Sequence, residues 1–237
     1  MTSHYLEKIP RCFTPCSIPD VVPMDGEAVI ILAGITDITP VELPIEELHR
    51  ADSITHQESR SRYLAGRYLL RGVLSSWLGM RPSDLPIALT STGKPFLSKG
   101  GTIHFSITHT AHTIAVIYSP QAVGIDLEQE RSLDLSGLAR RFFSAGEADY
   151  LEQSGSLHDF FRLWSCREAA IKADGRGLAT LLASTRVQAD ILGNGGQIRV
   201  GIEGVFWSAI PWILAGGIHG AAAFREVPGV IRWCDLR

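Results

Sequence analysis

Hydrophobic residues recur along the chain in two kinds of pattern, and short apolar or alternating runs predict strands. The run Glu27–Gly34 is apolar and ends in glycine, which is typical of a short buried strand. Residues 103–118 hold two more apolar runs, separated by a polar segment at 106–110 that we expect to interrupt the strand structure. Strands are also predicted over residues 123–128, 185–191 and 197–202, with a glycine-rich hairpin turn at 193–196.

The longer period, of 3.6 residues, predicts helices over residues 43–52, 58–79, 135–143, 145–151 and 158–174. The apolar face of the helix at 58–79 consists of Tyr63, Gly66, Leu70, Val73, Leu74 and Trp77. Arg62 falls inside this apolar arc, where an arginine needs an anion as partner because unpaired burial is costly. We expect Arg60 and Arg67 to lie on a solvated basic face.

The order of these elements favours an α+β fold with two similar lobes. Each lobe would combine a small, mostly antiparallel sheet with one long helix. We place the boundary so that residues 1–119 form the first lobe and residues 120–237 form the second.

Residues 204–224 carry no charged side chain, which raises the possibility of a membrane span. The stretch contains Pro211, His219 and four glycines, so two buried strands joined by a glycine-rich turn fit better than a helix. The first ten residues lack the apolar core of a signal peptide. We therefore expect a soluble protein of the cytoplasm, outside any membrane.

Composition narrows the classes of partner. A hydrophobic content of 45% is that of a globular protein, and the net charge of −3 argues against a general nucleic-acid binder. Cys12 and Cys16 are four residues apart, but no second close pair completes a zinc site, so all four cysteines are expected to be free thiols.

Two carboxylates share one face of the strand at 123–128. Gly124, Asp126 and Glu128 point to the same side, and residues two apart in a strand lie roughly 7 Å apart at Cα, so both carboxylates can reach one hard cation. Gly124 leaves room for a close approach to the backbone. By itself this pattern favours an ordinary amphipathic strand whose solvent-exposed face is acidic.

The helix at 158–174 carries charged residues beside an apolar stripe. Arg167 lies within the stripe and needs either a carboxylate or a ligand anion. Glu168 and Lys172 lie together at its edge, although this spacing also suits an ordinary surface salt bridge. Trp164 is expected to pack and support the helix.

The strand and this helix together resemble the signature of the 4′-phosphopantetheinyl transferase superfamily, in its two-lobed, monomeric Sfp-type branch. The strand motif is Gly124-Ile125-Asp126-Leu127-Glu128, and the helix motif runs from Trp164 through Arg167-Glu168-Ala169 to Lys172. Supporting matches are Gly93-Lys94-Pro95, Phe105 to Thr110, Phe142-Phe143-Ser144 with Glu147, and Gly175-Arg176-Gly177-Leu178.

The resemblance implies transfer of phosphopantetheine from coenzyme A to a serine of an acyl or peptidyl carrier protein, with release of 3′,5′-ADP. It implies that Asp126, Glu128 and Glu168 hold Mg²⁺ and that Asp126, Glu168 and Lys172 form the catalytic group. Glu168 would accept the serine proton and Lys172 would steady the phosphate oxygens.

The same resemblance implies a set of residues that bind coenzyme A, namely Arg50, Arg62, Lys94, Thr108, His109 and Lys172. The chain departs from the family pattern at Arg167, where lysine is usual, and at Thr108, where serine is commoner. Arginine is larger and planar, so Arg167 could change how the site engages carrier or phosphate.

Two other readings stay open. One is another Mg²⁺-dependent enzyme that cleaves a pyrophosphate, and the other is a protein that binds carrier or coenzyme A and has lost catalysis. A serine hydrolase is not supported, because the chain has no Gly-x-Ser-x-Gly motif. Carriers of fatty-acid, polyketide and nonribosomal-peptide synthesis are all possible targets.

Overall fold

The structure is a computed structural model of the 237-residue chain. It describes residues 6–8, 13–15, 17–99, 102–177, 181, 184–187 and 196–237. Cys12, Cys16, Leu178 and residues 188–195, which hold most of the expected hairpin turn, lie outside the described residues.

The first sheet contains the strands β2 (Phe13–Pro15), β3 (Glu27–Gly34), β6 (His104–His109), β7 (Thr113–Ser119) and β13 (Val230–Asp235). Its strand order is β2-β13-β3-β7-β6. Pairing is antiparallel from β3 to β6, whereas β13 runs parallel to both β2 and β3. A separate two-stranded ribbon is formed by β4 (Ile87–Leu89) and β5 (Pro95–Leu97).

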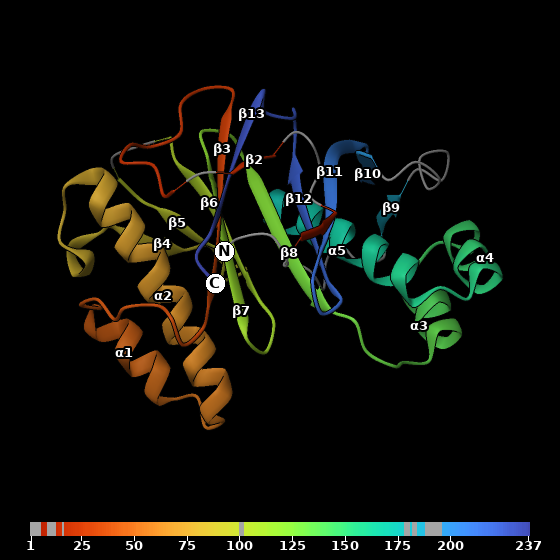
Figure 1. Cartoon of the computed structure of the whole chain (residues 1–237), viewed down its shortest axis with the longest axis horizontal. Helices are drawn as coiled ribbons and strands as arrows, with labels where there is room; N and C mark the ends of the chain where they lie inside the picture. Colours follow the sequence, from red (N-terminus) through yellow and green to blue (C-terminus); the bar gives the residue numbers. More distant parts are fainter. Residues whose placement is uncertain are drawn as a thin grey trace.

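Helix α2 (Gln57–Leu78) covers the outer face of this sheet, and the shorter α1 (Ile45–Asp52) packs beside it (Figure 1). Leu70 and Leu74 are fully buried against side chains of β3 and β7, as the apolar face of the predicted helix requires. The helix ends where Gly79 adopts a left-handed conformation with φ 62°. A 3₁₀ turn, η1 (Pro82–Asp84), follows it.

The second sheet is antiparallel and has the order β8-β12-β11-β10-β9, with β1 added to β11. Its strands are β1 (Leu6–Lys8), β8 (Val123–Gln129), β9 (Thr185–Val187), β10 (Ile198–Ile202), β11 (Val205–Leu214) and β12 (Ile218–Phe224). Helix α5 (Leu157–Asp174) covers its outer face, with α3 (Leu135–Phe142) and α4 (Ala145–Ser154) farther out (Figure 1).

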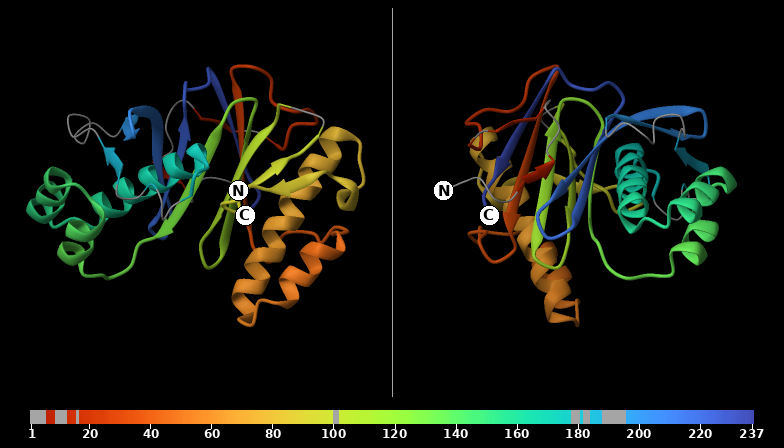
Figure 2. Two further views of the ribbon diagram at one scale, coloured as in Figure 1. Left: turned by 180° about the vertical axis from the view of Figure 1, so that it is seen from behind. Right: turned by 45° about the vertical axis from the view of Figure 1, so that its right-hand side comes forward.

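The inner faces of the two sheets pack against each other. Their shared core includes Ile30 and Leu32 of β3, Ile125 of β8 and Trp212 of β11. The molecule therefore has four layers, in the order α2, first sheet, second sheet and α5 (Figure 2). This arrangement confirms the predicted α+β class.

The strand pairings add detail to the predicted division at residues 119 and 120. The last strand, β13, returns to pair with β3 of the first sheet, and β1 near the start of the chain pairs with β11 of the second. We retain two lobes, residues 1–119 and 120–237, as a proposal in which each lobe lends one strand to the other's sheet.

The uncharged stretch 204–224 forms β11 and β12, as the sequence predicts. No helix within the part of the chain that the structure describes has the length and apolar character needed to cross a bilayer. Cys166 and Cys234 are buried, and burial raises the pKa of the Cys166 thiol to about 12.

The expected interruption at residues 106–110 is wrong in its position, because β6 continues through residues 104–109. Ser106 Oγ accepts a hydrogen bond from the backbone N–H of Ile125 (3.3 Å), and Thr108 Oγ1 accepts one from that of Leu127 (3.1 Å). These hydroxyls accept hydrogen bonds from backbone N–H groups at the edge of β8. They take the place of the carbonyl groups that a neighbouring strand would provide. Polar residues inside β6 thus form the seam between the two sheets.

Candidate active site

The contact between α5 and β8 depends on Gly124. A Cβ atom at this position would lie 2.0 Å from the carbonyl oxygen of Ala169 and 2.4 Å from the backbone nitrogen of Ala173, so only glycine fits. The predicted close approach therefore exists, and it is made by the helix backbone. This contact fixes the register that places Glu168 and Lys172 over the acidic face of β8.

Asp126 is buried at the centre of the site. Its Oδ1 accepts hydrogen bonds from Lys172 Nζ (2.5 Å) and from Thr108 Oγ1 (3.3 Å). Its Oδ2 is buried and has no hydrogen-bond partner. A buried carboxylate oxygen without a partner is costly, and it is also available to a cation.

Glu128 lies two residues farther along β8, where Trp164 Nε1 donates a hydrogen bond to its Oε1 (3.1 Å) and Arg131 contacts its Oε2 (3.4 Å). Trp164 packs against Phe142 and Phe160, as expected, but it also orients this carboxylate. Burial, followed by the nearby Asp126, raises the pKa of Glu128.

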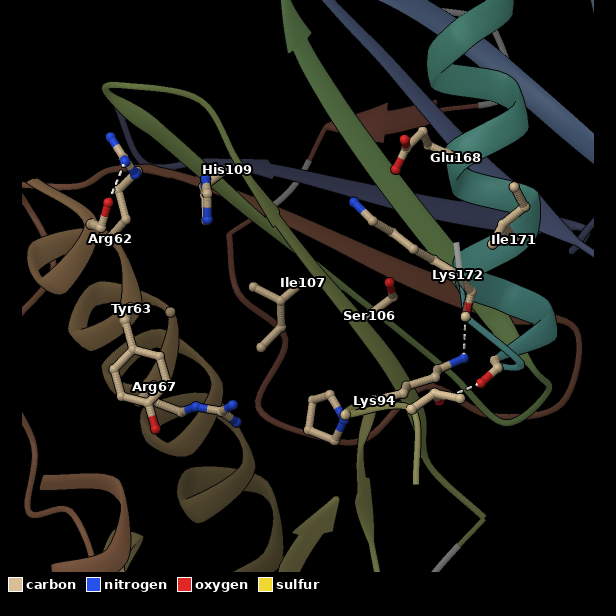
Figure 3. Close-up of a pocket in the computed structure, with 17 residues that line it drawn as sticks. Arg62, Tyr63, Arg67, Lys94, Ser106, Ile107, His109, Glu168, Ile171 and Lys172 are labelled. Atoms are coloured by element: carbon tan, nitrogen blue, oxygen red, sulfur yellow. Dashed lines mark hydrogen bonds between the residues drawn. The ribbon is translucent and has the colours of Figure 1, made fainter. Parts of the chain in front are cut away.

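Glu168 and Lys172 project from one side of α5 toward the cavity (Figure 3). Burial, with a smaller contribution from Asp126, raises the pKa of Glu168 to about 7. Three carboxylates therefore face one another in a partly desolvated place, where their repulsion favours a bound cation. An oxygen-only donor set of this kind suits Mg²⁺, and the free Oδ2 of Asp126 fits such an ion.

A cavity of about 450 Å³ opens beside these residues, lined by α2, the turn at residues 92–95, β6 and the end of α5 (Figure 3). A second cavity, of about 370 Å³, contains Asp126 and Glu128. Both cavities are lined by His109, Glu168 and Lys172, so they adjoin at these side chains.

Two arginines of α2 line the larger cavity. Arg62 is half-buried and contacts Ser59 Oγ (3.0 Å). The expectation that Arg67 is solvated is wrong, because its side chain is 13% exposed and its Nη1 is buried 3.8 Å from Glu47 Oε1. Its guanidinium lies 5.2 Å from the centre of the Tyr63 ring.

The deeply buried arginine of this helix is Arg71 rather than Arg62. Glu47 of α1 binds the Arg71 guanidinium through both carboxylate oxygens, at 2.9 and 3.0 Å. The anion expected inside the apolar arc is therefore supplied by the protein, and it holds α1 against α2. Arg50, in the last turn of α1, is exposed and does not line the larger cavity.

Lys94 lines the cavity, but its ammonium group also binds the end of α5. Nζ donates to the carbonyl oxygens of Lys172 (2.5 Å) and Ala173 (3.2 Å), and Thr92 Oγ1 donates to that of Gly175 (2.7 Å) (Figure 3). A cation at a helix C-terminus is favourable because the last carbonyls lack helical partners. Burial lowers the pKa of Lys94 to about 8.

This low pKa gives a testable dependence of stability on pH. Between about pH 8 and the unfolded-state pKa of 10.5, the unfolded chain binds more protons at Lys94 than the folded chain. The free energy of unfolding of the wild type, relative to a Lys94→Met variant, should therefore rise with pH across this window, by up to about 3 kcal/mol. Urea unfolding at pH 7.5 and at pH 10 measures the difference; a constant difference would contradict the buried ammonium.

Arg167 is fully buried and lines neither of the two cavities. Its Nη1 pairs with Glu147 Oε2 (3.1 Å), and its Nη2 donates to the carbonyl oxygen of Phe142 (2.6 Å). Glu147 also accepts hydrogen bonds from the backbone N–H groups of Ser144 and Val187. The departure from lysine therefore serves packing between α4 and α5, and the expected effect on carrier or phosphate has no support in this geometry.

The structure thus gathers most of the predicted residues. The cavities bring together Asp126, Glu128, Glu168, Lys172, Thr108, His109, Lys94 and Arg62. Sequence reasoning missed Tyr63, Arg67 and Ser106 as lining residues. The spacing of Tyr63 and Arg67, one helical turn apart and next to Arg62, was the available signal.

Carboxylates lie beside a cavity lined by arginines, lysines and a histidine, and side chains of these types are common at sites that bind phosphate groups. The family model of the 4′-phosphopantetheinyl transferase superfamily matches residues 122–209. The chain belongs to this superfamily.

Curated relatives agree with this assignment. HetI of Nostoc sp., named a 4′-phosphopantetheinyl transferase, is 39% identical over 151 residues, which cover 59% of this chain and 62% of HetI. Sfp of Bacillus subtilis is 31% identical over 65% of this chain and 69% of Sfp. AcpT of Salmonella typhimurium is 31% identical over 62% of this chain and 73% of AcpT. The match to HetI thus spans less than two thirds of that protein's length.

Proposed function

We propose that this chain transfers the 4′-phosphopantetheine group of coenzyme A to a serine of an apo carrier protein and releases 3′,5′-ADP. The observation that carries the proposal is the acidic group around Asp126, with its free Oδ2, beside a cavity lined by Arg62 and Arg67. The family and the names of HetI and Sfp support the same reaction.

The carboxylates of Asp126, Glu128 and Glu168 would hold Mg²⁺. When bound, the cation would neutralise charge on the pyrophosphate and on the departing 3′,5′-ADP. Trp164 and Arg131 each contact one oxygen of the Glu128 carboxylate and so fix its orientation. Asp126 Oδ2 has no hydrogen-bond partner, so no side chain must first leave it before a cation binds.

Glu168 and Lys172 carry the proton and charge movements. The carrier serine Oγ attacks the phosphorus that bears the pantetheine group, and the bond from that phosphorus to the oxygen of 3′,5′-ADP breaks. Glu168 accepts the serine proton, directly or through a water, and a pKa of about 7 suits a base near neutral pH. The ammonium of Lys172, held 2.5 Å from Asp126, steadies the phosphate oxygens.

The larger cavity would receive coenzyme A. Arg62, Arg67 and His109 line it from two elements, and Thr108 lies next to His109 on β6. Lys94 would contribute positive potential while it holds the end of α5, and Arg50 would act from the rim. We propose that the chain works as a monomer, because both walls of the cavity come from one chain. We also propose that it acts in the cytoplasm.

Arg67 gives a prediction about coenzyme A affinity. Arg67→Gln should raise the KM for coenzyme A by about 10-fold or more with little change in kcat, since a hydrogen bond to a charged group contributes about 1.5–3 kcal/mol. Arg60→Gln is the matched control, because Arg60 is on the same helix but exposed and paired with Asp52. Equal effects of the two substitutions would contradict a phosphate contact at Arg67.

The reaction itself is tested by chromatography of the nucleotide product. Incubation of the chain with coenzyme A, Mg²⁺ and an apo carrier protein should form 3′,5′-ADP, and omission of the carrier or addition of a chelator should abolish it. Product formation without a carrier would instead indicate a hydrolytic, pyrophosphate-cleaving enzyme.

A further inference from the structure

A second cluster of metal-ligating side chains lies outside the proposed active site. Glu130 directly follows β8, His158 is in the first turn of α5, and His219 is in β12. One ligand atom from each of these residues lies within 4.8 Å of the other two. Three segments that are far apart in the sequence therefore converge on one point.

Two of the three residues are already in contact. His219 is 1% exposed, and its Nε2 lies 2.8 Å from Glu130 Oε2. Phe161 of α5 stacks on the His219 ring with 5.8 Å between ring centroids, which fixes the ring from its apolar side. Packing thus determines the position of the His219 ring, and the contact with His219 holds one Glu130 oxygen beside it.

The third residue distinguishes this cluster from an ordinary histidine–glutamate hydrogen bond. The His158 ring lies 4.9 Å from that of His219, although His158 is exposed and takes no part in the contact between His219 and Glu130. An exposed side chain can rotate without breaking the core. Asp159, the next residue, adds negative potential close to His219.

The donor set selects a class of ion. Two imidazole nitrogens and one carboxylate oxygen suit Zn²⁺ and similar borderline ions, whereas Mg²⁺ and Ca²⁺ prefer oxygen ligands alone. Bonds of about 2.0–2.1 Å in a tetrahedral site place ligand atoms about 3.3 Å apart, so the Glu130–His219 pair must open slightly and His158 must move inward. Three protein ligands leave a fourth position for water.

We propose that Glu130, His158 and His219 form a binding site for one zinc-type divalent ion, separate from the carboxylate site of Asp126, Glu128 and Glu168. His219 pairs in register with Glu128, so the new site lies next to the carboxylate site on the same sheet. A bound ion would tie the end of β8 to the start of α5 and to β12, and would stabilise the folded chain by mass action.

The test is a titration of the metal-free full chain with Zn²⁺ in competition with a chromophoric chelator, in the presence of excess Mg²⁺. We expect one Zn²⁺ per chain. His158→Ala should weaken binding by about 100-fold or more, because loss of an outer-shell partner alone costs about 10–100-fold. His49→Ala, which removes an exposed histidine of α1, and Asp126→Asn should leave the affinity unchanged.

Three results of this titration would overturn the proposed zinc site. Absence of Zn²⁺ binding in the wild type does so directly, and an equal loss in His49→Ala would indicate adventitious binding to surface histidines. Loss of binding in Asp126→Asn would place the ion in the carboxylate site. Circular dichroism of His158→Ala checks the fold, and Glu130→Gln supplies an independent second variant, which should also lower the affinity.

Discussion

Asp126→Asn should lower the rate of phosphopantetheine transfer by about 1,000-fold or more while the chain stays folded. Asparagine keeps the size of the side chain but removes the charge that faces Lys172 and the oxygen without a hydrogen-bond partner. Loss of about 4 kcal/mol of transition-state stabilisation corresponds to this factor. Lys172 is 31% exposed, so water can replace its lost partner at small cost in stability.

The measurement is kcat/KM for carrier modification at saturating Mg²⁺, together with a thermal unfolding curve. Asp149→Asn is the control, because it removes an exposed carboxylate on α4. Near-normal turnover of Asp126→Asn would show that the acidic face of β8 does not hold the reacting cation.

Arg167→Met should produce the largest loss of stability of any substitution considered, about 3–5 kcal/mol. The substitution leaves Glu147 as a charge that is 2% exposed and without its cationic partner. It also removes the hydrogen bond to the carbonyl oxygen of Phe142. Urea unfolding at pH 7 measures the change, and transfer activity of the remaining folded protein should be close to normal.

A double variant separates the ion pair from packing. Glu147→Gln with Arg167→Met removes both charges, so it should be less destabilising than the sum of the two single substitutions. Additive effects would mean that the two side chains contribute independently, contrary to the contact of 3.1 Å. A loss below about 1 kcal/mol in Arg167→Met would equally contradict the role of this pair.

The elements with strong periodicity were predictable from the sequence. The strand at 27–34 has the bounds expected for it, and α2 and α5 lie within a residue or two of their predicted ends, where Gly79 and Gly175 take left-handed conformations. A long amphipathic helix followed by glycine leaves few alternatives. The uncharged stretch 204–224 was assigned to strands for a similar reason, since its glycines and proline oppose a helix.

The partners of the charged side chains, and how deeply each is buried, were not predictable in the same way. A helical projection shows that Arg62, Arg67 and Arg71 lie near one face, but it cannot show that Glu47 approaches Arg71 from another helix. Glu168 lies four residues before Lys172, so the sequence suggests an ion pair within the helix. The structure instead pairs Lys172 with Asp126, because Gly124 allows α5 to approach β8 closely. These outcomes depend on contacts between distant segments, which local patterns do not contain.

The polar run at 106–110 illustrates the same limit. A run of serine and threonine residues is typical of a bend. In β6, however, their hydroxyls accept hydrogen bonds from backbone N–H groups at the edge of β8. The family signature names Thr108 as a binding residue, and the structure adds that Thr108 joins the two sheets and contacts Asp126.

The most direct test of the proposed function is intact-protein mass spectrometry of an apo carrier protein after incubation with this chain, coenzyme A and Mg²⁺. Carriers from fatty-acid, polyketide and nonribosomal-peptide systems should each be tried. We predict that at least one carrier gains the mass of one phosphopantetheine group, and that the gain disappears when a chelator is added. An unchanged mass for all three carriers, with coenzyme A bound in calorimetry, would contradict transfer as the activity of this site.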